Sequence, residues 1–239
     1  MSTPMTLDTT VGSLAAEFPL ATRVFARHQI DYCCGGGRPL RDVCASKGLD
    51  AERLLDEIRT AIAPSGAPVD RWMDAPIDRL IDHIVTTYHL SLQEELPRLD
   101  AMAQKVLRVH GEKDPERLPE LQQVLSDLRA ELEDHMLKEE AILFPMIRRG
   151  HGGGAQGPVA VMLREHTEAG DALRRLRQLT DDYTPPAGAC NTWRALWYGL
   201  AALEADLHEH IHLENNILFP RALETATPPS GGSSPTACR

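Results

Sequence analysis

The chain has 239 residues, of which 42% are hydrophobic, and its 35 Asp and Glu against 25 Lys and Arg give a formal net charge of −10. This hydrophobic share is sufficient for a packed core, and the length fits one large domain or two modest ones. The acidic balance argues against nucleic acid and anionic membranes as partners.

Targeting signals and cysteine content indicate the cellular compartment in which the protein is expected. Residues 1–10 contain no basic region followed by an apolar run, so no signal peptide is expected. No apolar stretch approaches the length of a membrane span. The five cysteines are odd in number and two are adjacent, unlike a secreted disulfide framework. We therefore expect a cytoplasmic protein.

Residues 1–62 are predicted to form a small helical domain. Apolar residues recur at a helical period over Val11–His28, where a proline interrupts the pattern. Further helices are expected to start near Pro39 and Leu49. Residues 63–72, rich in Ala, Pro, Gly and Ser, are predicted to be a linker.

The segment Asp31–Gly37 lies between these helices and reads Asp-Tyr-Cys-Cys-Gly-Gly-Gly. Three consecutive glycines predict a tight turn. Adjacent cysteines such as Cys33 and Cys34 rarely form a disulfide with each other, because that ring is strained. Reactive thiolates, a metal or cluster relay, and a disulfide with a partner all remain open. The alternative is that both thiols pack as small hydrophobic side chains.

Residues 73–225 are predicted to be helical almost throughout, and no run in them alternates with period two. The expected helices are Pro76–Leu107, Pro115–Ile147, Pro158–Thr180 and Thr192–Leu223. Short connections between long helices predict an up-down-up-down four-helix bundle, and the fold class is therefore all-α. Residues 226–239 are rich in Ser, Pro, Gly and Thr and are predicted to be disordered.

One motif occurs twice in this bundle, as His135-x3-Glu139-x3-Leu-Phe-Pro and as His210-x3-Glu214-x3-Leu-Phe-Pro. Residues four apart lie on one face of a helix, one turn above each other. The histidine and glutamate of each copy are thus predicted to reach the same point beside their helix.

The periodicity places both copies on buried seams. Leucines step by three and four before each motif, and the isoleucines Ile142 and Ile217 continue the stepping after it. The leucines are Leu121, Leu125, Leu128 and Leu132 in one helix, and Leu196, Leu200, Leu203 and Leu207 in the other. A buried carboxylate without a partner is costly, and no Lys or Arg lies on either seam among these positions. Metal binding is the simplest explanation.

The first and third helices each add a seam histidine, His89 and His166. Each half of the bundle thus contains a lone histidine followed by a His-x3-Glu pair, which indicates an internal duplication. Four imidazoles and two carboxylates suit two metal ions, each held by two histidines, with both glutamates bridging. Imidazole and carboxylate without thiolate favour iron or manganese over structural zinc. The ferritin-like alternative is disfavoured, because it uses Glu-x-x-His.

Other polar residues lie near these ligands in sequence. Glu131, one turn before His135, and Glu165, next to His166, are candidates for fixing an imidazole or relaying protons, although ordinary surface charge is an equal alternative. Glu140 is expected to face solvent. His208 and His212 are expected to face solvent or to support the ligands, and His110 is expected at the surface.

The motif resembles the hemerythrin-like di-iron fold, and its combination with Asp31-Tyr-Cys-Cys-Gly-Gly36 resembles the repair-of-iron-centres family more specifically. The residues that match the family's iron ligands are His89, His135, Glu139, His166, His210 and Glu214. The resemblance implies a cytoplasmic protein with two non-haem irons that restores iron–sulfur clusters damaged by nitric oxide or peroxide. It also implies iron donation, reduction of nitric oxide to nitrous oxide, or both. The extra Gly37 departs from the family pattern.

Two other functional classes fit the pattern. One is a hemerythrin-like carrier or sensor of oxygen or nitric oxide, which does not need the paired cysteines. The other is a scaffold that docks on cluster-assembly proteins through residues 1–62, which does not need the full ligand set. A homodimer through the small N-terminal domain is a further expectation, because so short a helical unit buries little core alone.

Overall fold

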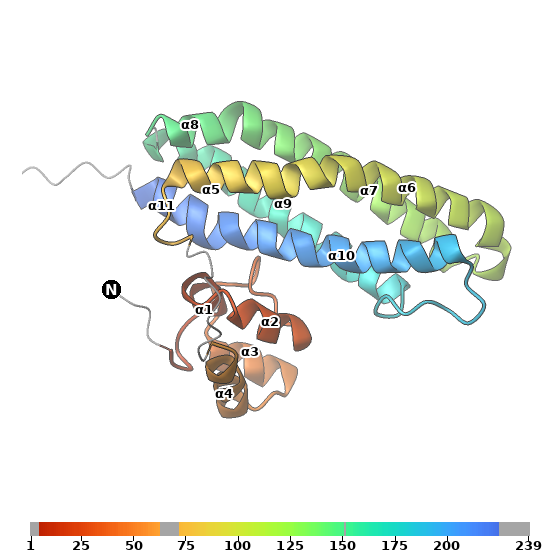
Figure 1. The fold of residues 1–239 in the computed structure, drawn as a ribbon, viewed down its shortest axis with the longest axis horizontal. Coiled ribbons are helices and arrows are strands. Elements are labelled where there is room, and N and C mark those ends of the chain that lie inside the picture. The colour runs from red at the N-terminus through yellow and green to blue at the C-terminus, as the bar shows by residue number, and fades with distance from the viewer. Residues whose placement is uncertain (1–4, 63–71, 151, 225–239) are drawn as a thin grey trace, which may run out of the picture.

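A computed structural model describes residues 5–62, 72–150 and 152–224. Over these ranges the chain is built from helices and contains no strand, only an isolated bridge between Thr10 and Pro39. Four long helices lie alongside one another, and a group of shorter helices packs beneath the fourth of them (Figure 1). The predicted all-α class, with a small helical part followed by a four-helix bundle, is confirmed.

The small domain consists of four helices around its own core. These helices are α1 (Val11–Glu17), α2 (Ala21–Arg27), α3 (Leu40–Lys47) and α4 (Ala51–Ile62). The side chain of Thr10 caps α1 by accepting a hydrogen bond from the backbone of Ser13, and the predicted break at Pro19 falls between α1 and α2. Fully buried residues such as Leu14, Phe25 and Ile58 fill the centre.

Three of the four bundle helices contain a π-helical turn. The first helix comprises α5 (Ile77–Ile84), η1 (Val85–His89) and α6 (Leu90–His110). The 3₁₀ turn η2 (Gly111–Lys113) leads to the second, which comprises α7 (Arg117–Lys138), η3 (Glu139–Leu143) and α8 (Phe144–Arg148). The third is α9 (Gly152–Leu179), and the fourth comprises α10 (Asn191–Leu213), η4 (Glu214–Leu218) and α11 (Phe219–Glu224). The π turns are η1, η3 and η4.

The start of the third helix differs from the prediction. A helix beginning at Pro158 is expected from the sequence, with the preceding glycines in a loop, but α9 already begins at Gly152. Ala155, in this early part of α9, is fully buried in the same hydrophobic cluster as residues of α8. Packing against the neighbouring helix therefore overrides the low helix propensity of glycine and the lost hydrogen bond at proline.

The predicted leucine seams are buried, with every one of the eight leucines at most 4% exposed. They belong to a large hydrophobic cluster towards the α6–α7 connection. A second cluster, which includes Leu80, Phe144 and Phe219, fills the opposite end of the bundle. The histidines and glutamates of the repeated motif lie between these two clusters, whereas its leucines and phenylalanines belong to the second.

The seam prediction is wrong at Ile142, which is 53% exposed, whereas the next residue, Leu143, is buried. The π turn η3 covers Glu139–Leu143 and accommodates one residue more per turn than an α-helix. The face that follows Glu139 is therefore shifted by one position. At the equivalent turn η4, Ile217 and Leu218 are both buried.

The small domain packs against α10 and η4. Tyr32 donates a hydrogen bond to Oε1 of Glu209 at 3.1 Å, and the side-chain amide of Asn216 donates one to the carbonyl of Tyr32 at 3.2 Å. Gly12 and Gly36 make room for this contact, because a Cβ on either one would clash with Oδ1 of Asn216. Glycine at these two positions thus allows the small domain and the bundle to approach each other closely.

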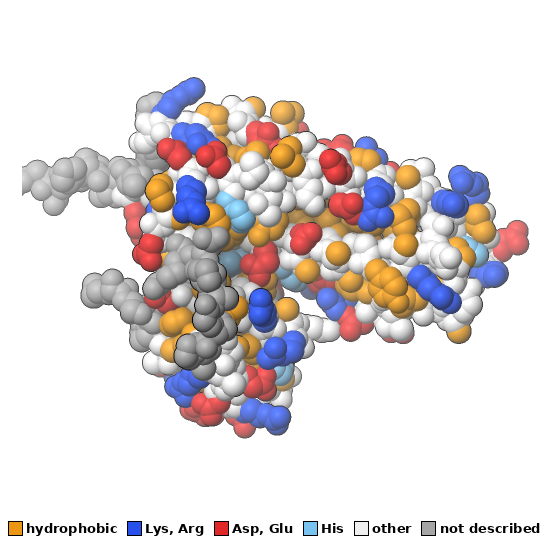
Figure 2. All heavy atoms as spheres, in the orientation of Figure 1, with side chains coloured by type: hydrophobic (Ala, Val, Ile, Leu, Met, Phe, Trp, Pro, Cys, Tyr) orange, Lys and Arg blue, Asp and Glu red, His pale blue; other side chains and the backbone are white. Residues whose placement is uncertain are grey.

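Charges of both signs are interspersed over the visible face, and histidine side chains appear where the small domain meets the bundle (Figure 2). Across the described ranges, every helix is too short or too polar to cross a membrane. The expected linker, apart from Trp72, and the expected disordered tail lie outside the described residues.

Candidate metal centre

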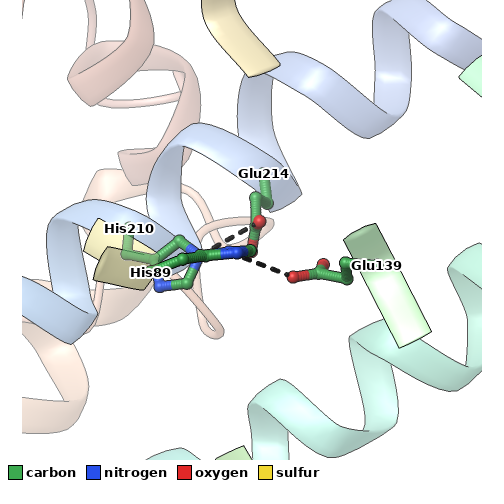
Figure 3. A group of neighbouring side chains, drawn as sticks. All are labelled: His89, Glu139, His210 and Glu214. Carbon is green, nitrogen blue, oxygen red and sulfur yellow. Dashed lines mark hydrogen bonds and ion pairs between the residues drawn. The ribbon is translucent and has the colours of Figure 1, made fainter. Parts of the chain in front are cut away.

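Six polar side chains from all four bundle helices converge between the two hydrophobic clusters. They are His89, His135, Glu139, His166, His210 and Glu214, and each is at most 3% exposed. These are the six residues that the sequence predicts as metal ligands. Figure 3 shows four of them, with the carboxylates of Glu139 and Glu214 directed towards the rings of His89 and His210.

The six residues form two groups that share both glutamates. One group is His89, Glu139, His210 and Glu214, and the other is His135, Glu139, His166 and Glu214. Within each group the potential ligand atoms lie within 4.8 Å of one another. Two histidines and two shared carboxylates per position are the donor sets expected for a carboxylate-bridged pair of ions.

Each glutamate faces one histidine from each of the two groups. Oε2 of Glu139 lies 3.4 Å from Nε2 of both His89 and His135. Oε1 of Glu214 lies 3.1 Å from Nε2 of His210, and its Oε2 lies 3.2 Å from Nε2 of His166. Both carboxylates therefore stand between the two positions.

In each histidine ring, the hydrogen-bond partner of Nδ1, the nitrogen that faces away from the centre, influences where the ring hydrogen lies. Nδ1 of His89 lies 2.9 Å from a carboxylate oxygen of Glu140, and Nδ1 of His135 lies 2.9 Å from one of Glu165. A carboxylate only accepts hydrogen bonds, so Nδ1 carries a hydrogen and Nε2 faces inward, where a metal can take the place of a proton. This is the arrangement that binds a metal through Nε2.

Several buried polar atoms of the centre have no hydrogen-bond partner. Both carboxylate oxygens of Glu139, Oε2 of Glu214 and Nδ1 of His210 are buried without one. Buried polar atoms normally find a partner, so these exceptions require an explanation. A cation bound between the glutamates would satisfy the carboxylate oxygens, and the donor set therefore fits a metal site.

Electrostatics favour positive charge at the same place. Burial raises the pKa of Glu214, but His210 and His166 outweigh burial and hold it well below its ordinary value. Burial lowers the pKa of His135, yet Glu139 and Glu214 outweigh burial and raise it to about 9. The carboxylates thus remain ionised and attract either protons on the imidazoles or a metal cation.

The π turns coincide with the ligands. His89 is the last residue of η1, whereas Glu139 and Glu214 are the first residues of η3 and η4. Single π turns inside α-helices are rare and are frequent at functional sites, where they redirect side chains. Their occurrence at these three residues supports a functional role for the cluster.

Aromatic rings hold the imidazoles in place. Phe144 stacks on His89 with ring centroids 5.7 Å apart, and Phe219 stacks on His166 at 6.0 Å. These are the phenylalanines of the repeated Leu-Phe-Pro segment, so each copy of the motif also packs the lone histidine of its own half. Tyr88 stacks on His210 at 5.4 Å.

The candidate supporting residues differ in their contacts. Glu165 contacts His135 through one oxygen and the ammonium group of Lys138 through the other, at 2.9 Å and 2.5 Å. Glu131 is exposed, and it lines a cavity of about 100 Å³ together with Glu165, His135 and His166. The structure thus places Glu165 against a predicted ligand and Glu131 at the solvent-facing side of that cavity.

Sequence reasoning missed two contacts of the lone histidines. Glu140 is exposed, as expected, but its carboxylate also contacts Nδ1 of His89. Asn215 accepts a hydrogen bond from Nδ1 of His166 at 2.7 Å. Both residues directly follow the motif glutamate, so the duplication contains the signal for this shared role.

Two other histidines are less exposed than expected. His212 is 2% exposed, lies 3.1 Å from the amide of Asn216 and contacts the ring of Tyr32 edge-on. Burial lowers the pKa of His212 to about 4, which keeps the ring neutral. His110 is buried against Trp193 and lies 3.3 Å from the thiol of Cys190. Neither belongs to the two groups of candidate ligands.

The adjacent cysteines lie where the small domain meets the centre. Cys33 is 3% exposed and Cys34 is partly exposed, and their sulfur atoms are 3.7 Å apart. Oδ1 of Asp31 accepts hydrogen bonds from the backbone of Cys33, Cys34 and Gly35, which organises the turn. The hydrogen bond from Cys33 to Cys34, burial and the nearby Asp31 raise the pKa of Cys33 well above its ordinary value.

Their surroundings leave the roles predicted for them open. Asp31, Cys33 and Cys34 form a third group whose potential ligand atoms lie within 4.8 Å of one another. Both cysteines line a cavity of about 330 Å³ between the small domain and the helices α9 and α10. The thiol of Cys34 donates a hydrogen bond to the backbone carbonyl of His166 at 3.2 Å.

Comparison with known proteins gives matches over both parts of the chain. Residues 80–222 match the hemerythrin HHE cation binding domain, and residues 7–62 match a domain of unknown function, DUF542. A protein named iron-sulfur cluster repair protein YtfE from Yersinia pseudotuberculosis serotype IB (strain PB1/+) is 47% identical over 213 residues, which cover 89% of this chain and 96% of the relative. The protein of the same name from Yersinia pestis (strain Pestoides F) shows the same identity and coverage.

Proposed function

Because this chain belongs to the family of iron–sulfur cluster repair proteins with a hemerythrin HHE cation binding domain, we propose that it repairs iron–sulfur clusters damaged by nitrosative or oxidative stress. The two groups of buried histidines that share Glu139 and Glu214 carry this proposal. The relatives are named for iron–sulfur cluster repair, and a metal bound in this centre would be one from which iron is donated or at which a small oxidant is reduced.

Two iron ions per chain fit the charge of the centre. Glu139 and Glu214 lie between the histidine pairs, while Glu140 and Glu165 contact outer ring nitrogens. These four carboxylates balance the charge of two ferrous ions, and Lys138 is offset by Asp134, 3.1 Å away. Imidazole and carboxylate donors without thiolate suit iron.

Bound iron would supply one-electron redox chemistry and coordination positions that the six protein groups leave free. The protein residues would hold the ions and orient the imidazoles. Reduction of two nitric oxide molecules to nitrous oxide and water consumes two electrons and two protons. We assign proton delivery to Glu165 and Glu131, which line the cavity next to His135.

Iron donation is the second activity that we propose for this centre. A damaged iron–sulfur protein would then be the partner, and Cys33 and Cys34 would serve in redox exchange or in relaying iron. The hydrogen bond from the thiol of Cys34 to the backbone carbonyl of His166 supports this role. Residues 1–62 and 73–225 would act as separate domains that cooperate at this junction.

A carrier or sensor of oxygen or nitric oxide is the alternative function. It requires the bundle alone, and it gives no reason for the cysteine turn to dock on a ligand. The contacts from Cys33 and Cys34 to the His166 region therefore favour repair. We also propose that the protein is cytoplasmic and that it forms a homodimer.

One anaerobic experiment tests the proposal. The purified protein is reduced, its iron is counted, and nitric oxide is added while nitrous oxide is followed by gas chromatography. Two irons per chain with rapid nitrous oxide formation support reduction. Two irons with stable nitrosyl species and no nitrous oxide support donation, which is tested next on a cluster-depleted enzyme. Zinc in the centre, or no bound metal, would contradict both.

A further inference from the structure

The two repeats of the bundle treat their lone histidines alike, with one chemical difference. In the first repeat, the residue after the motif glutamate is Glu140, which binds Nδ1 of His89 at 2.9 Å. In the second repeat it is Asn215, whose Oδ1 binds Nδ1 of His166 at 2.7 Å. The same position therefore supports the lone histidine in both halves, but it carries a carboxylate in one and a neutral amide in the other.

The amide of Asn215 makes a contact that a carboxylate cannot make. Its Nδ2 donates a hydrogen bond to the backbone carbonyl of Cys33 at 3.3 Å. An ionised carboxylate has no hydrogen to donate, and two oxygens facing each other would repel. Asn215 therefore connects the imidazole of His166 to the cysteine turn through a single side chain.

The same histidine is also contacted through its backbone. The thiol of Cys34 donates a hydrogen bond to the carbonyl of His166 at 3.2 Å. Next to Asn215, the amide of Asn216 donates to the carbonyl of Tyr32 at 3.2 Å. The cysteine turn thus holds residue 166 at the main chain and, through Asn215, at the ring.

The other three imidazoles of the centre are held differently. His89 and His135 are supported by Glu140 and Glu165, which belong to the bundle itself. Nδ1 of His210 has no hydrogen-bond partner. Of the four described imidazoles in the centre, His166 is therefore the one whose ring is linked to the small domain by hydrogen bonds.

We propose that Asn215 is a positioning residue through which the cysteine turn, Asp31–Gly36, sets how tightly the position of His135 and His166 holds its ion. The inference rests on the proposed function in one respect, namely that a metal ion occupies this position. Partners of the outer ring nitrogen fix the tautomer and orientation of a metal-binding histidine, and their loss typically weakens metal binding by about 10- to 100-fold.

The physical reason lies in the orientation of the amide. The carbonyl of Cys33 accepts from Nδ2, and this turns Oδ1 towards the ring of His166. When the cysteine turn moves away, the amide is free to rotate and the ring loses its fixed acceptor. Movement of the cysteine turn would thus weaken metal binding at the position of His135 and His166. Binding at the other position, where Glu140 supports His89, would be unchanged.

The first experiment follows metal release. The protein is loaded anaerobically with Fe(II), its iron is counted, and transfer to a chromogenic chelator is recorded. In Asn215→Ala we expect one ion to leave about 10-fold faster than in wild type, while the other keeps its rate. Glu140→Ala is the matched control at the equivalent position, and the double variant should accelerate both ions. Wild-type release of both ions from Asn215→Ala would overturn the proposal.

The second experiment needs no iron. Nitrogen-15 NMR of the metal-free protein, at a pH where the ring is neutral, should show His166 as the Nδ1–H tautomer in wild type and a mixture in Asn215→Ala. Asn215→Asp keeps the acceptor and removes the donor, so it should retain the tautomer while Cys33 becomes more reactive towards a maleimide. An unchanged tautomer in Asn215→Ala would refute the positioning role, even if the wild-type protein binds no iron and the proposed function fails.

Discussion

The Nε2 atoms of His89 and His210 lie 3.2 Å apart, although the two residues come from the first and fourth helices of the bundle. His135 and His166 repeat this relationship at 3.0 Å. Glu139 and Glu214 are buried beside both pairs, and no described Lys or Arg pairs with either carboxylate. The protein thus brings its donor atoms together around positions suited to cations.

Replacing either bridging carboxylate should abolish the pair of ions while the helices remain. In Glu139→Leu or Glu214→Leu, each position loses a shared ligand, and the apolar side chain is compatible with the buried seam. We expect iron to fall to at most one per chain, with an unchanged circular dichroism spectrum. Metal analysis is the measurement, and Glu133→Leu, on the exposed side of the same helix, is the control. Two irons per chain in either variant would refute the ligand assignment.

The six candidate ligands are predictable from the sequence because they continue leucine seams and because the motif is duplicated. The seam repeats every three or four residues, which defines the inward face of an ordinary α-helix. Glu140, in contrast, is not predictable from that period. It lies about 100° from Glu139 on an ideal helix, and the π turn that begins at Glu139 changes the local geometry. The same π turn explains why Ile142 is exposed although the sequence predicts it on the buried seam.

The contact between the small domain and the bundle also cannot be predicted from the sequence pattern. Gly12 and Gly36 lie far from Asn216 along the chain, and their role is apparent only once these residues are in contact. The burial of His212 follows from the same interface, because Tyr32 covers it. Helical periodicity describes one element at a time, and it contains no information on which solvent-facing positions meet another domain.

Removal of an aromatic ring beside the centre should destabilise the protein. Phe144 is 2% exposed, packs in the second hydrophobic cluster and stacks on His89. Phe144→Ala should lower the free energy of unfolding by about 3–5 kcal/mol, because it leaves a cavity in a packed core. Chemical denaturation of the metal-free protein measures this loss. Phe144→Leu, which keeps most of the volume, should cost clearly less; equal costs would show that stacking on His89, rather than volume, is what matters.

Neutralising the carboxylate behind His135 should weaken metal binding without unfolding the protein. Glu165→Gln keeps the side-chain shape, but it removes the charge that holds the ring hydrogen of His135 and the ammonium group of Lys138. Metal affinity should fall by less than the about 10- to 100-fold that is typical when such a partner is lost altogether, because the amide oxygen of glutamine still accepts from Nδ1. Competition with a chelator measures the change.

The control for Glu165 lines the same cavity. Glu168 is exposed and forms its ion pair with Arg164, away from the histidines. Glu168→Gln should therefore leave metal affinity near the wild-type value. A similar loss in both variants would point to the general negative charge of the cavity rather than to the contact with His135.

Substitutions at the two interface glycines should distinguish a clash with a side-chain atom from a clash with the backbone. Gly12→Ala brings a Cβ against Oδ1 of Asn216, a side-chain atom, so shortening that side chain in Gly12→Ala/Asn216→Ala should restore docking. Gly36→Ala also brings its Cβ to 2.6 Å from the carbonyl oxygen of Tyr32, which is backbone, so the same rescue should fail.

Each single glycine substitution should weaken docking by about 1–3 kcal/mol, the usual cost of overpacking a close contact. The rate at which a maleimide modifies the buried Cys33 reports on docking, because the turn opens when the small domain separates from the bundle. A double-mutant cycle with Asn216→Ala as the second change isolates the shared contact. If Asn216→Ala rescues Gly36→Ala as fully as Gly12→Ala, the backbone clash at Tyr32 is not what makes Gly36 necessary.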